Sequence, residues 1–417
     1  MSSADPIIVV GAGIVGVSTA IWLQRDGHKV TIIDRLPPGE GTSFGNGGVL
    51  ASCAVVPVTG PGLITKAPKM VVDPESPLFL RWSYLPRLLP WLTRYLMNAN
   101  KRDTKRIAEA LSYVVPGSLE EHQQLAEGTG AEHWIAPSDY LYLYGDRAAF
   151  DGEAFSWGLR REAGITWDEF DRSAFSDYDP IFDESVGFAV KMGDHGHIRD
   201  PGQYVKDLAA HFVNEGGTLL QTSVEDVDRH GDEITAVVTS DSTLDCSSFV
   251  LCGGVWSGPL AKKLGLAVPL ETERGYHIEL YEPNIMPRAP VMIASGKFVA
   301  TPMEGRLRLA GIVEFGGLNA PPSEKPFEFL LRHIKRAIPN LTWEREERWM
   351  GHRPAPTDSI PVMGFAPGLK NAVTGFGHHH IGLTAGPKTG RILADLIAGR
   401  RPNFDLAPFD PARFAAE

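Results

Sequence analysis

The sequence predicts an α/β fold with mixed α+β character, in which one domain has a parallel sheet built from discontinuous segments and the other has a mixed antiparallel sheet. The first observation is a strand, turn, helix and second strand at residues 6–34. The second is a set of apolar strands at 218–254 that ends in Gly-Gly and a helix start, which we expect to return to the first sheet. The third is a block of alternating strands between 269 and 314.

The first segment has the pattern of a dinucleotide site. Residues 6–16 read PIIVVGAGIVG, an apolar strand that runs into a GxGxxG turn, and the next strand ends in an acid. Gly11 allows the tight turn, Gly13 lets backbone N–H groups approach a pyrophosphate, and Gly16 lets helix and strand pack closely. Together these features form a Rossmann-like fingerprint. The predicted cofactor-binding residues here are Gly11, Ala12, Gly13, Ile14, Val15, Gly16, Asp34 and Arg35.

Asp34 narrows the choice of dinucleotide. Its carboxylate can accept hydrogen bonds from the ribose hydroxyls, whereas it would repel a 2′-phosphate, so NADP is disfavoured. The fingerprint alone leaves FAD and NAD open.

Length and composition exclude several classes. A chain of 417 residues predicts two domains, and a net charge of −11 makes nucleic acid an improbable partner. The three cysteines have no spacing typical of a metal site or a disulfide framework. The first strand begins at Pro6, which leaves no room before it for a signal peptide, and no apolar run is long enough to span a membrane. We therefore expect a cytoplasmic protein.

The segment 78–97 allows two interpretations. It is rich in Leu and Trp and carries spaced arginines, which is the composition of an interfacial helix. The interpretation we favour is a helix pair, broken at Pro86 and Pro90, that packs on its own protein or on a partner subunit. Peripheral contact with the inner face of a membrane stays open.

A second glycine-dense loop follows the fingerprint at 39–48. Its backbone amides could lie against a phosphate or the edge of a flat ring, and the alternative is a flexible surface loop. The residues that we expect to contact the cofactor are Thr42, Ser43, Asn46, Gly47 and Gly48.

The chain as a whole resembles a known family. Four motifs stand in the same order as in the FAD-dependent D-amino-acid oxidase superfamily: the fingerprint, the loop at 42–48, the turn CGGVWS at 252–257, and a C-terminal block at 349–390. Within it, the chain most resembles bacterial D-amino-acid dehydrogenases (small subunit) and glycine oxidase-like proteins. The resemblance implies a Rossmann-like FAD-binding domain at 1–54, 192–264 and 340–417, and a substrate-binding domain at 55–191 and 265–339.

The C-terminal block supplies most of the implied site. In the family, a G-x-R-P strand carries the arginine that binds the substrate carboxylate, which here is Arg353. The chemistry agrees, because a guanidinium offers two parallel N–H donors to a carboxylate. The following loop and helix start contact the flavin. The further cofactor-binding residues are Val224, Gly253, Trp256, Gly377, His378, Gly382, Leu383 and Thr384.

Three further residues are assigned to the substrate pocket. His380 falls where some relatives carry a basic side chain over the substrate, and Tyr276 and His277 are expected to line the pocket. The three consecutive histidines at 378–380 do not predict a metal site, because adjacent residues converge poorly on one ion. Phe298 departs from the pattern of glycine oxidase-like enzymes, which place a tyrosine there, and so argues against glycine-like substrates.

The resemblance also implies how the cofactor is held. Relatives of the sarcosine oxidase type attach the flavin covalently through a cysteine in the block before the substrate-binding residues. No cysteine occurs at 349–353, so we expect noncovalent FAD.

The resemblance implies an enzyme that oxidises the C–N bond of a D-amino acid by hydride transfer to flavin N5. The resulting imino acid hydrolyses to a 2-oxo acid and ammonia. The alternatives are oxidation of a secondary amine (a hydroxyproline, an N-methyl amino acid or an opine) by the chain alone or as a subunit of a larger complex, an NAD-dependent dehydrogenase, and a noncatalytic flavin-binding subunit. The electron acceptor (quinone, oxygen or a partner subunit) and the oligomeric state stay open.

Overall fold

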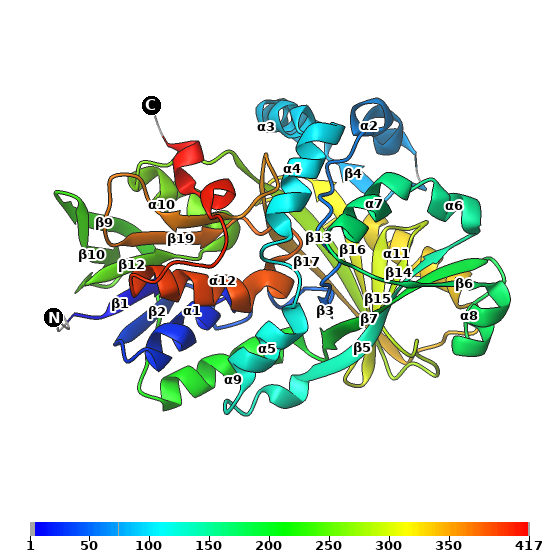
Figure 1. Ribbon diagram of the computed structural model, residues 1–417, viewed down its shortest axis with the longest axis horizontal. Coiled ribbons are helices and arrows are strands. Elements are labelled where there is room, and N and C mark those ends of the chain that lie inside the picture. Colours follow the sequence, from blue (N-terminus) through cyan, green and yellow to red (C-terminus); the bar gives the residue numbers. More distant parts are fainter. Residues whose placement is uncertain (1–4, 74, 416–417) are drawn as a thin grey trace.

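The computed structural model describes residues 5–73 and 75–415, and it contains two main sheets. The six-stranded sheet has the order β18-β19-β12-β1-β2-β8, and it lies to the left in Figure 1. Its strands are β1 (Ile7–Val10), β2 (Val30–Asp34), β8 (Thr218–Gln221), β12 (Ser248–Leu251), β18 (Val362–Phe365) and β19 (Ala372–Phe376). All of its pairings are parallel except the one between β18 and β19. The expected return of the strands at 218–254 to the first sheet is therefore confirmed for 218–221 and 248–251, and it is wrong for the strands at 224–245, which form a sheet of their own.

The second sheet has ten strands and runs β17-β13-β16-β15-β14-β5-β7-β3, with β4 and β6 attached to β16 and β7. Its pairings are mainly antiparallel, as the sequence predicts. The strands are β3 (Val49–Leu50), β4 (Leu78–Leu80), β5 (Ile135–Tyr144), β6 (Asp168–Asp171), β7 (Phe188–Ile198), β13 (Leu270–Tyr281), β14 (Val291–Ile293), β15 (Phe298–Met303), β16 (Arg306–Phe315) and β17 (Arg345–Pro356). A separate small sheet holds β9 (Val224–His230), β10 (Glu233–Thr239) and β11 (Thr243–Asp245).

The helices cover these sheets. Those packed on or beside the six-stranded sheet are α1 (Ile14–Arg25), α4 (Lys101–Leu111), α5 (Ser118–Ala126), α9 (Pro201–Asn214), α10 (Ser257–Lys263) and α12 (Gly382–Ile397). The others are α2 (Leu63–Val72), α3 (Leu85–Met97), α6 (Arg147–Asp151), α7 (Ala154–Glu162), α8 (Arg172–Tyr178) and α11 (Lys325–Ala337).

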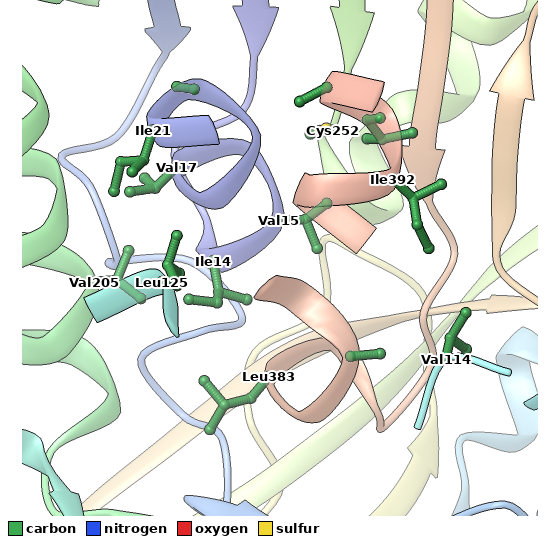
Figure 2. Packing of buried hydrophobic residues seen from close by; sticks show 14 of the residues in the cluster. Ile14, Val15, Val17, Ile21, Val114, Leu125, Val205, Cys252, Leu383 and Ile392 are labelled. Atoms are coloured by element: carbon green, nitrogen blue, oxygen red, sulfur yellow. The ribbon is translucent and has the colours of Figure 1, made fainter. Parts of the chain in front are cut away.

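The largest buried cluster joins α1 to α12. Figure 2 shows Ile14 and Leu383 from the two helices close together, with Val205 and Leu125 on the other side of Ile14. The helices approach closely because α12 has glycines at the contact: a Cβ at Gly390 would lie 2.6 Å from the Cβ of Ser18. This packing fixes the N-terminus of α1, where the fingerprint begins, beside the N-terminus of α12.

The expected break of the 78–97 segment at both prolines is wrong. A single helix, α3, follows the short strand β4 and continues through Pro90. Pro86 is tolerated in the first turn, where a backbone N–H has no partner within the helix. The buried face of α3 packs on the protein, and the indole N–H of Trp91 donates to the carbonyl of Ala355 (3.0 Å). In the part of the chain that the structure describes, no helix is long and apolar enough to cross a membrane.

The two sheets do not follow the predicted domain boundaries everywhere. β3, β17 and the end of β7 (192–198) lie in the ten-stranded sheet, although the predicted boundaries place them in the FAD-binding domain. Conversely, α4 and α5 lie within 55–191 but contribute to the cluster around α1. The boundaries differ because an element near a boundary joins the sheet on which its apolar face packs. Sequence motifs do not show which sheet that is. The division into two domains itself stays a prediction.

Candidate active site

A cavity of about 850 Å³ lies between the two main sheets. One wall is formed by the carboxyl ends of β1 and β2 and the turn after β12, where ligands of open α/β sheets bind. The opposite wall comes from β13, β16 and β17 and from the N-terminal loop of α12. Parts of the chain from Val10 to Thr384 therefore meet in one site.

The fingerprint turn has the geometry that a pyrophosphate requires. Gly11 has φ +115°, and a Cβ there would lie 2.4 Å from the carbonyl oxygen of Cys252. The N–H of Ala12 donates to Oδ2 of Asp34 (2.7 Å), and the N–H of Ile14 donates to the hydroxyl of Ser43 (3.0 Å). Since the turn has little side-chain bulk and opens at the positive end of α1, these residues fit the phosphates of a dinucleotide.

The adenosine side of the cavity is lined by residues from the end of β2, the start of β9 and the turn after β12. Asp34, Arg35, Val224, Gly253 and Trp256 all face it. The guanidinium of Arg35 lies 4.3 Å from the ring centre of Trp256, a cation–π contact that holds both side chains at the rim. This arrangement fits a ribose and a flat adenine ring.

The loop at 41–48 is held by side chains of the ten-stranded sheet that donate to its backbone carbonyls. Arg308, which is fully buried, donates from Nη1 to the carbonyl oxygens of Phe44 (2.8 Å) and Asn46 (2.7 Å). Thr301 donates to the carbonyl of Gly47 (2.6 Å). The loop is therefore held in place by β15 and β16, and the interpretation as an unanchored surface loop is wrong.

Two predicted cofactor residues lie outside the cavity. A Cβ at Gly16 would lie 1.9 Å from the carbonyl oxygen of Gly11, so Gly16 serves helix packing. Gly48 has φ +78°, and a Cβ there would lie 2.7 Å from the methyl group of Met303. Neither residue lines the cavity, which corrects their assignment as cofactor contacts, whereas the close packing at Gly16 agrees with its place in the fingerprint. The predicted residues that do line the cavity are Gly11, Ala12, Gly13, Ile14, Val15, Asp34, Arg35, Thr42, Ser43, Asn46, Gly47, Val224, Gly253, Trp256, Arg353, Gly377, His378, His380, Gly382, Leu383 and Thr384.

Arg353 is held over the sheet by two backbone carbonyls. Its Nη1 donates to Ile312 O (2.9 Å) and its Nη2 to Gly311 O (2.7 Å). The register between β13 and β16 shifts at Gly275, and Ile312 has φ +51°, which is strained for a β-branched residue. The bulge turns successive carbonyls toward one guanidinium. Gly275 leaves the space for it, because a Cβ there would lie 2.7 Å from Cζ of Arg353.

A buried acidic network adjoins Arg353. Glu273 faces the cavity, with Oε2 lying 2.5 Å from Nε2 of His379 and Oε1 accepting a hydrogen bond from the Tyr95 hydroxyl (3.3 Å). Burial alone would raise the pKa of Glu273, but His379 and the nearby Arg353 and His380 outweigh it and lower that pKa. Glu273 is therefore ionised and partly balances the charge of Arg353.

The three histidines at 378–380 point to different partners. His378 Nε2 lies 3.0 Å from the hydroxyl of Thr389, and His379 has a left-handed backbone (φ +52°) that turns its ring to Glu273. His380 faces the cavity, and its Nδ1 has no hydrogen-bond partner among the described residues. Burial lowers the pKa of His380 to about 3, so its ring is neutral. No group of three or more His, Cys, Asp or Glu residues within 5–73 and 75–415 could hold a metal ion.

Tyr276 and His277 do not line the cavity, which corrects the expectation for both. The Tyr276 side chain points to the other face of β13, where its hydroxyl donates to Oε2 of Glu314 (2.5 Å). The His277 ring is covered by the loop, with Nδ1 lying 3.2 Å from the carbonyl oxygen of Gly45, and it stacks on Trp349. Burial lowers the pKa of His277 to about 3. Phe298 is also fully buried away from the cavity.

Several cavity residues had no sequence signal. Glu273 and Tyr95 belong to the network beside Arg353, and Tyr142, Arg160 and Lys297 form the far end of the cavity. All five lie outside the recognised motifs: strand pairing places Glu273 and Tyr142, whereas the packing of helices and a loop places Tyr95, Arg160 and Lys297.

The fold and the site together define a dinucleotide-binding oxidoreductase of the flavoprotein type, with a guanidinium facing the cofactor cavity. The family described as FAD-dependent oxidoreductases (DAO) matches residues 6–396, and the chain belongs to this family. It binds FAD, and the alternative of an NAD-dependent dehydrogenase is set aside.

Individual relatives agree with this assignment. The chain is 36% identical to a D-amino-acid oxidase of Bradyrhizobium diazoefficiens, over 99% of this chain and 100% of the relative. It is 29% identical to a D-amino acid dehydrogenase of Paramagnetospirillum magneticum, over 94% and 95% of the two chains. Among solved structures, a glycine oxidase from Geobacillus kaustophilus has a TM-score of 0.74 at 21% identity, covering 98% of both chains, and so supports the fold.

Proposed function

We propose that this enzyme oxidises the C–N bond of a D-amino acid. The substrate loses two electrons and two protons at this bond, as a hydride from the α-carbon and a proton from the nitrogen, and becomes an imino acid, which water hydrolyses to a 2-oxo acid and ammonia. FAD, when bound, accepts the electrons. The single observation that carries the proposal is the position of Arg353 on the cavity wall, and the names of the relatives support the D-amino acid class.

Arg353 is suited to hold the α-carboxylate. A guanidinium has five N–H donors, and the two carbonyl bonds to Gly311 and Ile312 leave N–H groups for a ligand. The neighbouring His380 is neutral and Glu273 is ionised, so the site offers one strong anion-binding group rather than a diffuse positive field. A carboxylate fixed in this way orients the reacting carbon.

The test is anaerobic mixing of the purified holoenzyme with pairs of enantiomers while the flavin absorbance is followed. We expect D-amino acids to bleach the flavin and their L-enantiomers not to do so. A panel of hydroxyprolines, N-methyl amino acids and opines distinguishes oxidation of a secondary amine. If only those amines bleach the flavin, the proposal of a primary D-amino acid is wrong.

Arg353→Lys tests the carboxylate assignment. Lysine keeps the positive charge but loses the planar pair of donors, so we expect kcat/KM to fall about 10- to 100-fold, since a hydrogen bond to a charged group contributes about 1.5–3 kcal/mol. The flavin spectrum of the variant serves as the control for folding. An unchanged kcat/KM would show that the carboxylate binds elsewhere.

The electron acceptor and membrane contact remain parts of the proposal to be tested separately. Reoxidation of the reduced enzyme by oxygen, by a soluble quinone or by neither distinguishes an oxidase, a dehydrogenase and an enzyme that needs a partner subunit. On α3 and the preceding turn, Trp82 (61%), Leu89 (49%) and Met97 (70%) are exposed, in keeping with an interfacial contact. Co-sedimentation with anionic vesicles tests that prediction.

A further inference from the structure

The far end of the cavity contains a buried arginine, Arg160 of α7. Its side chain is only 7% exposed, and it lines the cavity. Among the residues that the structure describes, it makes no ion pair with a carboxylate. Burying a charge without a counter-charge costs free energy, so an anionic ligand would stabilise this residue.

The contacts of Arg160 hold it without neutralising it. Its Nε donates to the carbonyl of Cys53 and its Nη2 to the hydroxyl of Tyr142, both at 3.3 Å. The guanidinium also lies 4.5 Å from the ring centre of Trp157 and 5.1 Å from that of Tyr142. The remaining nitrogen, Nη1, is buried and has no hydrogen-bond partner within the described residues. The side chain is therefore rigidly placed and retains unused donors.

The acidic residue at the far end of the cavity, Glu153, already has partners of its own. Glu153 forms an ion pair with Lys297 and accepts a hydrogen bond from Tyr144 (2.9 Å). Two cations, Arg160 and Lys297, thus face the cavity against one carboxylate. The excess positive charge favours an anion.

An apolar strip joins this end to Arg353. Ala310, Val299, Met292 and Tyr142 are successive partners across β16, β15, β14 and β5, and all four line the cavity. Arg353 is bonded to β16 and Arg160 to β5, which are three strand spacings apart, or roughly 14 Å at about 4.8 Å each. A site with a guanidinium at both ends and a methylene-binding strip between them matches a dicarboxylic amino acid.

We propose that Arg160 binds the side-chain carboxylate of the substrate while Arg353 binds its α-carboxylate, so that the preferred substrates are acidic D-amino acids such as D-aspartate and D-glutamate. The inference rests on the proposed function, because it names the substrate class of the same site. It adds a specificity residue, Arg160, that none of the sequence motifs predicts.

The first test compares each acid with its amide. Flavin reduction in the holoenzyme is measured with D-glutamate against D-glutamine and with D-aspartate against D-asparagine. We expect the wild-type chain to favour the acids, and Arg160→Met to lower the acid-to-amide ratio of kcat/KM about 10- to 100-fold, the range for loss of a hydrogen bond to a charged group. Arg161→Met, at the next and exposed position of α7, is the matched control and should keep the wild-type ratio. A wild-type enzyme without acid preference, or an unchanged ratio in Arg160→Met, overturns the inference.

A binding test gives a readout that does not need turnover. Glutarate and butyrate differ by one carboxylate, and each is titrated into the holoenzyme while the flavin absorbance is recorded. Glutarate should bind more tightly to the wild-type chain, and the difference should vanish in Arg160→Met. If that variant loses the flavin, Arg160→Lys takes its place. It should retain part of the difference in affinity between glutarate and butyrate, because lysine keeps the positive charge but lacks the planar pair of N–H donors. Equal binding of the two probes to the wild-type chain overturns the inference.

A further variant separates this role from pairing with the nearby thiol of Cys53. In Cys53→Ser, the acid-to-amide ratio should stay as in the wild-type chain. If it falls as far as in Arg160→Met, Arg160 serves Cys53 instead, and the inference fails. The proposed function is judged independently, because oxidation of neutral D-amino acids without acid preference would sustain it while removing Arg160 from substrate binding.

Discussion

At Arg353 and Glu273 the site balances two buried charges of opposite sign. Arg353 supplies the anion-binding donors, and Glu273 limits the positive potential at the same wall of the cavity. Burial lowers the pKa of Arg353, whereas Glu273 opposes that shift. The pair therefore sets the electrostatic potential that a flavin and its substrate would meet.

Neutralising Glu273 should raise the reduction potential of the bound flavin. Glu273→Gln removes a negative charge from the cavity wall, which favours the more negative reduced flavin. We expect a shift of the order of +30 mV, since about 30 mV corresponds to 1.4 kcal/mol in a two-electron couple. Spectroelectrochemical titration measures it.

Glu271→Gln is the matched control for this variant. Glu271 lies two residues away on the same strand, but its carboxylate accepts from the Tyr84 hydroxyl at 3.0 and 3.1 Å and does not line the cavity. The reduction potential of the flavin in Glu271→Gln should stay near the wild-type value. A lower potential in Glu273→Gln would contradict the assigned role.

At the scale of elements, the loop at 41–48 depends on a buried charge network beneath it. Arg308 bonds to two loop carbonyls and also to Oε1 of Glu279, with Nε at 3.0 Å and Nη2 at 2.6 Å. Burial would raise the pKa of Glu279, but Arg308 and Arg306 lower it to about 2. The network thus stays charged over the ordinary pH range and keeps the loop in one conformation.

Arg308→Met should weaken FAD binding without changing a residue of the cavity lining. The substitution releases two loop carbonyls and removes one partner of a buried acid, which destabilises a protein by about 3–5 kcal/mol. Fluorescence titration of the apoprotein with FAD measures the affinity, and chemical unfolding measures the stability. In Arg308→Met/Glu279→Met no unpaired acid is left, so stability should partly recover while FAD affinity stays low. Full recovery of FAD affinity would show that the loop carbonyls do not need Arg308.

The link between α5, α9 and α12 predicts a pH dependence. His122 lies between the hydroxyl of Tyr204 (3.0 Å from Nδ1) and the carbonyl of Leu383 (2.9 Å from Nε2). Since a carbonyl only accepts, Nε2 carries the proton and Nδ1 accepts from Tyr204. Burial lowers the pKa of His122 to about 4, so the ring is neutral in the folded chain.

Stability from His122 should be lost as the pH falls from about 6.5 to about 4. In that window the unfolded chain binds a proton that the folded chain excludes, which lowers the free energy of unfolding by about 1.4 kcal/mol per pH unit. His122→Gln removes this proton linkage. We expect urea unfolding between pH 6.5 and 4.5 to show a correspondingly smaller slope against pH in the variant, and an identical slope would contradict the prediction.

How far the sequence predicts the elements depends on whether their determinants are local. The fingerprint, the strands of the alternating block and the turn at 252–257 are continuous in sequence, and the structure confirms their secondary structure. The sequence does not predict the side on which Tyr276 lies, because neighbouring strand residues point to opposite faces and a bulge at Gly275 changes the register there. Glu273 and Arg160 could not be predicted, since strand pairing between distant segments places Glu273, and contacts of α7 with the distant residues Cys53 and Tyr142 place Arg160. The continuous α3 shows that a proline within the first turns need not end a helix.

On the scale of the whole molecule, the cavity couples two sheets that have separate cores. The hydrophobic cluster around α1 is distinct from the one around β13 to β16. Each sheet nevertheless forms one wall of the same cavity. A ligand that touches both walls stabilises both sheets together, whereas one that touches a single wall stabilises that wall alone.

Full-length FAD should therefore protect both halves of the chain, and AMP only one. At a free FAD concentration 1,000-fold above its Kd, the folded state gains about 4 kcal/mol, and hydrogen exchange should slow at the N-terminus of α1 and also around Gly275 and Gly311. AMP carries only the part of the cofactor that fits Asp34 and the fingerprint, so it should slow exchange near α1 and β2 and leave β13 and β16 as in the apoprotein. Mass spectrometry of peptides from the two sheets distinguishes these patterns. Equal protection of both sheets by AMP would mean that they respond as one cooperative unit, and protection by FAD near α1 alone would mean that β13 and β16 do not hold the flavin.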